Sequence, residues 1–136
     1  MKNKFRPLLQ VREQEQLLQE SIVSKLYLDI SHLEEKIAAN MKILSNLKIP
    51  QSGKFMLIMQ SRVIFESIRK EIKILSTQKE QKKQELATEQ EKLIEINIEY
   101  EKSKYLYNEE HKKFLVFMQK EEQKELEDIG QKLSQI

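Results

Sequence analysis

The two histidines, His32 and His111, are the side chains in this sequence that could act as imidazole bases or as nitrogen ligands of a metal, and the chain has no cysteine. Asp29 and His32 lie three residues apart, which puts both side chains on one face of a helix. A metal site in a helical bundle needs several such pairs, and Asn108 with His111 does not supply a second one. We therefore interpret both histidines as solvated and expect no bound metal.

A second candidate for chemistry is Ser52-Gly53-Lys54, which resembles the end of a phosphate-binding loop. Such a loop also needs an upstream glycine and a preceding β-strand, and this sequence supplies neither. We expect no ATP hydrolysis, no cofactor and no enzymatic activity.

The composition is typical of a protein built from long helices. Of the 136 residues, 34% are charged, and glycine and proline number two each. The 24 basic and 22 acidic side chains are interspersed, which disfavours nucleic-acid binding. The longest apolar run, Phe55 to Met59, is far shorter than a membrane span, and no signal-peptide core follows the N-terminus. We expect a soluble protein of the reducing cytoplasm, without direct membrane insertion.

The stretch from Lys54 onward predicts one long coiled-coil helix, because apolar side chains return at every seventh residue. Lys79 interrupts this series, and the half-heptad positions alternate between apolar and polar types. The heptad series is Ile58, Phe65, Ile72, Lys79, Leu86, Leu93, Tyr100, Tyr107 and Phe114; at the half-heptad positions Ile68, Leu75, Ile96 and Phe117 are apolar, and Ser61, Lys82, Glu89, Ser103 and Glu110 are polar.

A first helix precedes the only break in the chain, Pro50-Gln51-Ser52-Gly53. Because the break is short, the two helices should return antiparallel. The predicted fold is all-α: a single coiled-coil domain over residues 1–136, forming a two-helix hairpin with a longer C-terminal helix. We expect the helices at about 5–48 and 54–130, with the turn at 49–53. The first helix repeats at about 3.6 residues through Leu18, Ile22, Leu26, Ile30, Leu33, Ile37, Met41, Leu44 and Leu47.

A turn centred near Gln51 predicts that the numbers of facing residues add up to about 102. Gln10 to Gln16 would then lie antiparallel to Leu86 to Glu91. The N-terminal end of the first helix would lie opposite about position 98. Residues from about Glu99 onward would have no partner, although they carry several aromatic side chains. The predicted layers are Leu44 with Ile58, Ile37 with Phe65, Leu33 with Ile68, Ile30 with Ile72, and Leu26 with Leu75.

Two groups of apolar side chains are candidate partner-binding residues, because exposed apolar surface usually marks a binding site. The first group lies at the end that carries both termini, and the second lies just after the turn, on the side opposite Ile58 and Phe65. The aromatic group could bind a different protein or a second copy of this chain, and the second group could merely cover the turn. The candidates are Phe5, Leu8, Leu9, Tyr100, Tyr105, Tyr107, Phe114 and Phe117 near the termini, and Met56, Met59, Val63 and Ile64 near the turn.

The chain resembles the FliJ family, the small coiled-coil component of the bacterial flagellar type III export apparatus. The start of the sequence carries one part of the resemblance, Phe5-x-x-Leu8-Leu9-x-x-Arg12-Glu13-x-Glu15. A second part lies near the end, in Glu122-Gln123-Lys124-x-x-Glu127-Asp128-Ile129. The unequal lengths of the two predicted helices are the third. In the family the acidic pair usually reads Asp-Glu, whereas here it is reversed.

This resemblance implies a non-enzymatic role in flagellar protein export and motility, with three kinds of protein partner. These are the hexameric export ATPase, contacted by the end carrying the termini, the cytoplasmic domain of the export gate, and the export chaperones. The gate contact would lie around Met59, Val63 and Ile64. It also implies a peripheral location at the inner-membrane export apparatus. The alternative is a structural or tethering coiled coil that self-associates through Tyr100 to Phe117.

Overall fold

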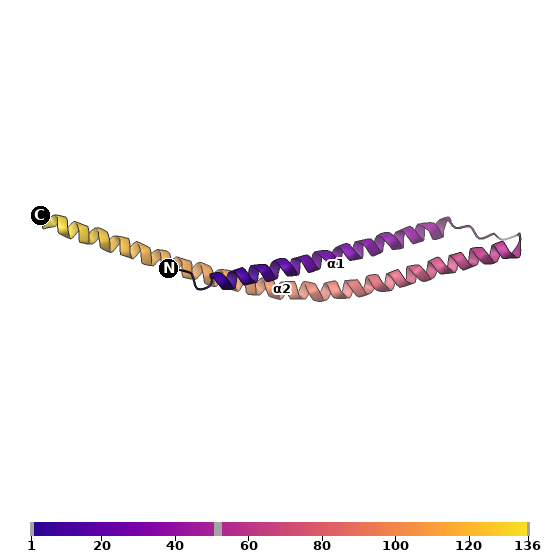
Figure 1. Cartoon of the computed structure of the whole chain (residues 1–136), viewed down its shortest axis with the longest axis horizontal. Coiled ribbons are helices and arrows are strands. Elements are labelled where there is room, and N and C mark those ends of the chain that lie inside the picture. Colours follow the sequence, from indigo (N-terminus) through magenta and orange to yellow (C-terminus); the bar gives the residue numbers. More distant parts are fainter. Residues whose placement is uncertain (1, 51–52, 136) are drawn as a thin grey trace. The chain divides into compact units, whose positions relative to one another are not determined.

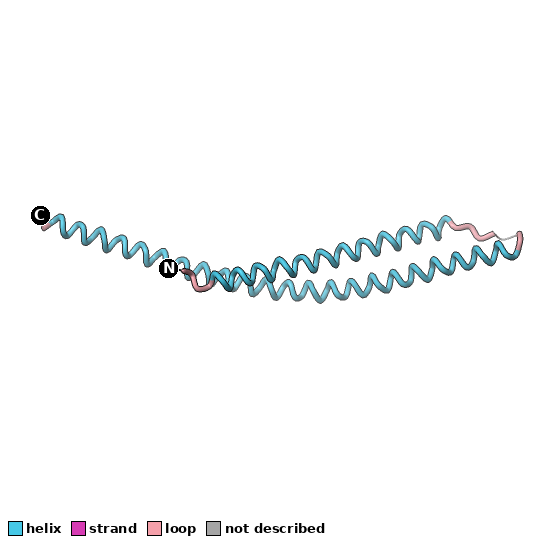
Figure 2. The backbone as a smooth tube through the Cα atoms, in the orientation of Figure 1, coloured by secondary structure: helices cyan, strands magenta, loops and turns pink. Residues whose placement is uncertain are grey.

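The structure is a computed structural model that describes residues 2–50 and 53–135. Over this part the chain forms two helices, α1 (Arg6–Asn46) and α2 (Phe55–Ser134), and no β-strand. Figure 1 and Figure 2 show the helices running side by side in opposite directions. The predicted all-α hairpin with a longer C-terminal helix is therefore confirmed.

Local signals in the sequence explain where α1 begins and ends. The Asn3 side-chain oxygen accepts a hydrogen bond from the Phe5 N–H (3.0 Å), and Pro7 sits in the first turn, where a missing N–H costs little. The helix ends at Asn46, two residues before the predicted end, ahead of Ile49 and Pro50.

The connection leads into α2 through Gly53, whose φ of 131° is a backbone conformation that favours glycine. Gln51 and Ser52, around which the predicted turn was centred, lie outside the described residues. The second helix continues through Gly130 to Ser134, four residues past its predicted end.

The contacts divide the chain into two compact units. Unit 1 comprises Met1–Leu18 and Leu93–Ile136, and unit 2 comprises Gln19–Lys92. Each unit contains a segment of α1 paired with a segment of α2.

The side chains of α2 that turn toward α1 follow the predicted heptads. Every predicted heptad position from Ile58 to Phe114 is buried or half-buried, including Lys79. The polar half-heptad positions are covered as well, and Ser103 is only 3% exposed. The period of seven therefore identified the buried face of α2 even where it carries polar residues, because position in the repeat decides which way a side chain points.

The buried face of α1 differs from the prediction. Leu18, Ile22 and Met41 were expected on it, but they are exposed, and Leu18 keeps 66% of its surface. The other six predicted residues are buried or half-buried, as expected: Leu26, Ile30, Leu33, Ile37, Leu44 and Leu47. The three exposed ones are replaced by neighbours one position away, Gln19, Val23 and Asn40, and the face continues toward the N-terminus through Gln16, Arg12 and Leu9. Contact with a strictly heptad partner keeps α1 on a repeat of 3.5 residues, so the untwisted 3.6-residue series drifts off the interface.

The predicted register is also wrong. In unit 2, Lys79 Nζ lies 3.3 Å from Glu34 Oε1 and Lys82 Nζ lies 3.9 Å from Asp29 Oδ2. These residue numbers add up to 113 and 111 instead of 102, so the five predicted layers are displaced by more than two helical turns. α1 ends at Asn46, and residues 47–50 run on beyond it without turning back (Figure 1), so the end of α1 does not lie opposite the start of α2.

Unit 1 shows the same displacement. The Gln16 amide donates a hydrogen bond to the Asn97 side-chain oxygen (2.8 Å), and Tyr100 donates a long one to Glu13 (3.5 Å). Gln16 therefore faces Asn97 rather than Leu86. The N-terminal segment covers α2 well past position 98, because the Asn3 amide donates to the Tyr107 carbonyl (2.9 Å).

Candidate protein-binding surfaces

The N-terminal residues and α2 enclose a groove in unit 1 that we call the terminal groove. Its volume is about 920 Å³. Phe114 is half-buried in it, whereas Phe117 is 54% exposed. The lining residues are Lys2, Asn3, Lys4, Arg6 and Pro7 from the N-terminal segment, and Tyr107, Glu110, His111, Lys113, Phe114 and Phe117 from α2. The groove therefore combines an aromatic floor with a mainly cationic rim.

The other candidate residues near the termini differ in how far the rest of the chain covers them. Tyr100 and Tyr107 are half-buried beside the start of α1, so they were wrongly assigned to a stretch without a partner. Phe5 and Leu9 are half-buried, and Leu8 is exposed. From Leu115 to Ser134 every residue of α2 is exposed.

Tyr105 does not join the terminal groove. It is 64% exposed and lines a separate apolar hollow of about 790 Å³ with Ile94, Ile98 and Leu106. All of these side chains come from α2 alone, on the face turned away from α1. This hollow is a shallow apolar stripe on one helix.

The candidates near the turn form one exposed cluster in unit 2, which we call the tip patch. Phe55, Met56, Met59, Val63 and Ile64 are all exposed, and they line a hollow of about 430 Å³. Ile58 and Phe65, on the heptad face of α2, are half-buried, so the two faces separate as the sequence predicted. Methionine side chains are flexible and polarisable, which suits a surface that adapts to a partner.

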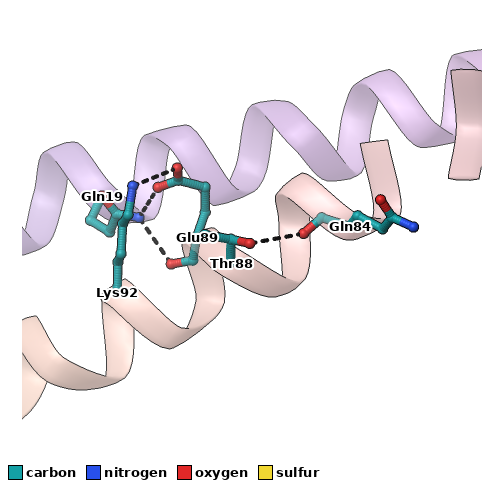
Figure 3. A network of polar contacts seen from close by, with 5 residues as sticks. All are labelled: Gln19, Gln84, Thr88, Glu89 and Lys92. Carbon is teal, nitrogen blue, oxygen red and sulfur yellow. Dashed lines mark hydrogen bonds and ion pairs between the residues drawn. The ribbon is translucent and has the colours of Figure 1, made fainter. Parts of the chain in front are cut away.

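A polar layer interrupts the apolar interface of unit 2 (Figure 3). The buried Gln19 amide donates hydrogen bonds to the Glu89 carboxylate (2.6 Å) and to the Glu89 carbonyl (2.9 Å). Lys92 Nζ also binds this carboxylate, at 3.2 Å. The hydrogen bond from Gln19, followed by the contact with Lys92, lowers the pKa of Glu89 because both stabilise its charged form.

The histidines and their neighbours take part in other contacts. Asp29 pairs with Lys82, and the His111 ring stacks on Tyr107 with 6.3 Å between centroids. His32 is exposed on α1. Within residues 2–50 and 53–135, no group of three or more His, Asp or Glu side chains is placed to hold a metal ion.

The sequence reasoning missed the cationic rim of the terminal groove. The Asn3 amide donates a hydrogen bond to the Tyr107 carbonyl, and Lys4 Nζ lies 5.2 Å from the centre of the Phe5 ring. The available signal was the run of three cations, Lys2, Lys4 and Arg6, ahead of Pro7. Its meaning depends on the register, because only the observed register brings these residues close to Phe114.

Comparisons of this chain with protein-family models, with curated proteins and with solved structures find no match. Neither described helix contains an apolar stretch long enough to cross a membrane.

Proposed function

We propose that this protein is a non-enzymatic adaptor of bacterial flagellar protein export. In this role it binds the export ATPase through the terminal groove, and the cytoplasmic domain of the export gate through the tip patch. Export chaperones are its third class of partner. It works in the cytoplasm, peripherally at the inner-membrane export apparatus.

The observation that carries this proposal is that each of the two compact units carries its own exposed apolar surface. The terminal groove lies in unit 1 and the tip patch lies in unit 2. Exposed aromatic and methionine side chains are the usual anchors of helix-in-groove binding. The FliJ-like start and end of the sequence supply the identity of the partners, and the unequal hairpin agrees with that resemblance.

A binding experiment with purified components tests the proposal. Wild-type protein should capture the export ATPase and the cytoplasmic domain of the gate. Phe114→Ala/Phe117→Ala should weaken ATPase binding about tenfold or more while leaving the gate domain bound. Met59→Ser/Val63→Ser should weaken binding of the gate domain about tenfold or more and leave the ATPase bound.

Matched controls use exposed apolar residues of α2 outside both surfaces. Leu126→Ala/Leu133→Ala and Ile74→Ser should leave both complexes unchanged, since these side chains line neither hollow. Failure of the wild-type protein to bind the ATPase, the gate domain and the chaperones would show that the proposal is wrong.

A further inference from the structure

We infer that the terminal groove binds an acidic amphipathic segment of a different protein, with carboxylates on the cationic rim and apolar side chains on the aromatic floor. This inference deepens the proposed function and rests on it for the place of that partner in export. It concerns the chemistry that the groove recognises.

The charge of the groove is the first argument. Four permanent cations line it, Lys2, Lys4, Arg6 and Lys113, against the single carboxylate Glu110. None of these four cations forms an ion pair within the part of the chain that the structure describes. The chain as a whole carries a net charge of only +2, so this concentration of unpaired positive charge is local. Such a rim attracts carboxylates and raises the rate of association with them.

The shape of the groove is the second argument. Phe114 is half-buried and lines the groove together with Pro7, so a ligand must insert side chains to reach it. The flat surface of a bilayer does not do this, whereas a helix or an extended peptide does. Arginine and aromatic residues are also the types that dominate the energetics of protein interfaces.

The chain's own acidic tail is not the occupant. Five carboxylates lie between Glu121 and Asp128, but α2 is continuous from Phe55 to Ser134. A continuous helix carries this tail away from Phe117 at about 1.5 Å per residue, so it does not fold back into the groove.

A second copy is disfavoured by the phase of the helix. The residues that continue the face of Phe117 are Glu121, Lys124 and Asp128, whereas Leu126, Ile129 and Leu133 lie about 120–180° away at 100° per residue. A closed two-fold pair must use the same face of both copies. Because this face is charged beyond Phe117, a pair formed along it would bury little apolar surface, so the groove fits a different protein.

The test uses a synthetic amphipathic peptide of about 18 residues, with glutamate on one face and leucine on the other. Its control is the same peptide with lysine in place of glutamate. In fluorescence anisotropy, the acidic peptide should bind the full-length protein at least about tenfold more tightly than the lysine peptide, and added salt should weaken it.

Variants locate the binding. Lys4→Glu/Lys113→Glu should weaken binding of the acidic peptide about tenfold or more, and Phe114→Ala/Phe117→Ala should do the same. Lys25→Glu/Lys83→Glu makes the same change in net charge in unit 2, outside the groove, and should leave binding intact. Lys4→Gln/Lys113→Gln provides a milder substitution if the charge reversal lowers the helical circular dichroism.

Several results would overturn the inference. Equal affinity for the acidic and lysine peptides would do so, as would equal losses of affinity in the groove variants and the control variant. Tighter binding to phosphatidylglycerol vesicles than to the acidic peptide would also contradict it. So would sedimentation as a dimer that Lys4→Glu/Lys113→Glu dissociates. If export components bind but the peptide does not, the inference fails and the proposed function stands. If the peptide binds through these cations but no export component binds, the proposed function fails and the groove chemistry stands.

Discussion

Polar residues at interface positions determine much of how these two helices meet. Gln19 occupies a buried position of α1, and its amide satisfies both the carbonyl and the carboxylate of Glu89. A buried polar group that lost such a partner would carry a desolvation cost of about 1–3 kcal/mol. Sliding the helices by one heptad would separate this pair, so the polar layer favours one register over its neighbours.

The first prediction concerns the carboxyl group of Glu89. Gln19→Met should raise the pKa of Glu89 toward its ordinary value, because it removes the strongest stabilisation of the charged form. A titration of the side-chain carbon by NMR measures the change. Gln84→Met is the control, since only the backbone carbonyl of Gln84 takes part in the network, accepting from Thr88 (Figure 3).

The sign of the pH dependence follows from the lowered pKa. The stabilisation from Glu89 is fully present above the ordinary carboxyl pKa and is lost as the pH falls through the lowered value. The difference in unfolding free energy between wild type and Gln19→Met should therefore shrink in that acidic range. A difference that grew on acidification would contradict this account.

At the scale of the elements, one face of each helix is buried and its neighbouring faces are exposed. Leu26 is 7% exposed, whereas Leu28, two residues further along α1, is 55% exposed. The two leucines share a residue type, a helix and a unit, so they differ mainly in whether they face α2.

The second prediction uses this matched pair. Leu26→Ala should reduce the free energy of unfolding by about 2 kcal/mol or more, because it removes apolar side chain from the interface. Leu28→Ala should change it by less than about 0.5 kcal/mol, since an exposed side chain loses little burial. Urea titrations followed by circular dichroism measure both values, and similar losses in the two variants would contradict the observed face.

The ion pairs of α1 with α2 explain how polar residues fit into the register. Lys79 and Lys82 occupy heptad positions, and their side chains reach across the interface to Glu34 and Asp29. The aliphatic stem of a lysine can cover apolar surface while its ammonium group stays near water, which agrees with the burial of Ile30.

The third prediction distinguishes the observed register from the tight-turn register. Carbodiimide joins amines to carboxylates without a spacer, so it should link Asp29 to Lys82 and Glu34 to Lys79, the pairs at 3.9 Å and 3.3 Å. Peptide mass spectrometry identifies these links. Predominant linkage of Asp29 to Lys73, which a sum of 102 would bring together, would refute the observed register.

At the scale of the whole molecule, apolar surface is exposed in both units. The terminal groove lies in unit 1 and the tip patch in unit 2, so substitutions in one should leave binding at the other unchanged. The variants of each surface therefore serve as controls for binding at the other surface. The surface available for self-association through Tyr100 to Phe117 is smaller than expected. Tyr100 and Tyr107 are half-buried beside α1, so only part of the expected aromatic surface is exposed.

The sequence by itself determined the fold class, the break between the helices, the buried face of α2 and the exposure of the tip patch. Each of these follows from local properties: the seven-residue repeat, a proline that ends a helix, and side chains placed opposite the repeat. Only the tertiary structure decided the register, the three positions of α1 where Gln19, Val23 and Asn40 replace the predicted residues, and the composition of the terminal groove. Many registers of a hairpin bury similar apolar area, so the choice depends on the path of the connection and on specific polar pairs such as Gln19 with Glu89. Residues as distant in sequence as Lys4 and Lys113 become neighbours only once that register is set.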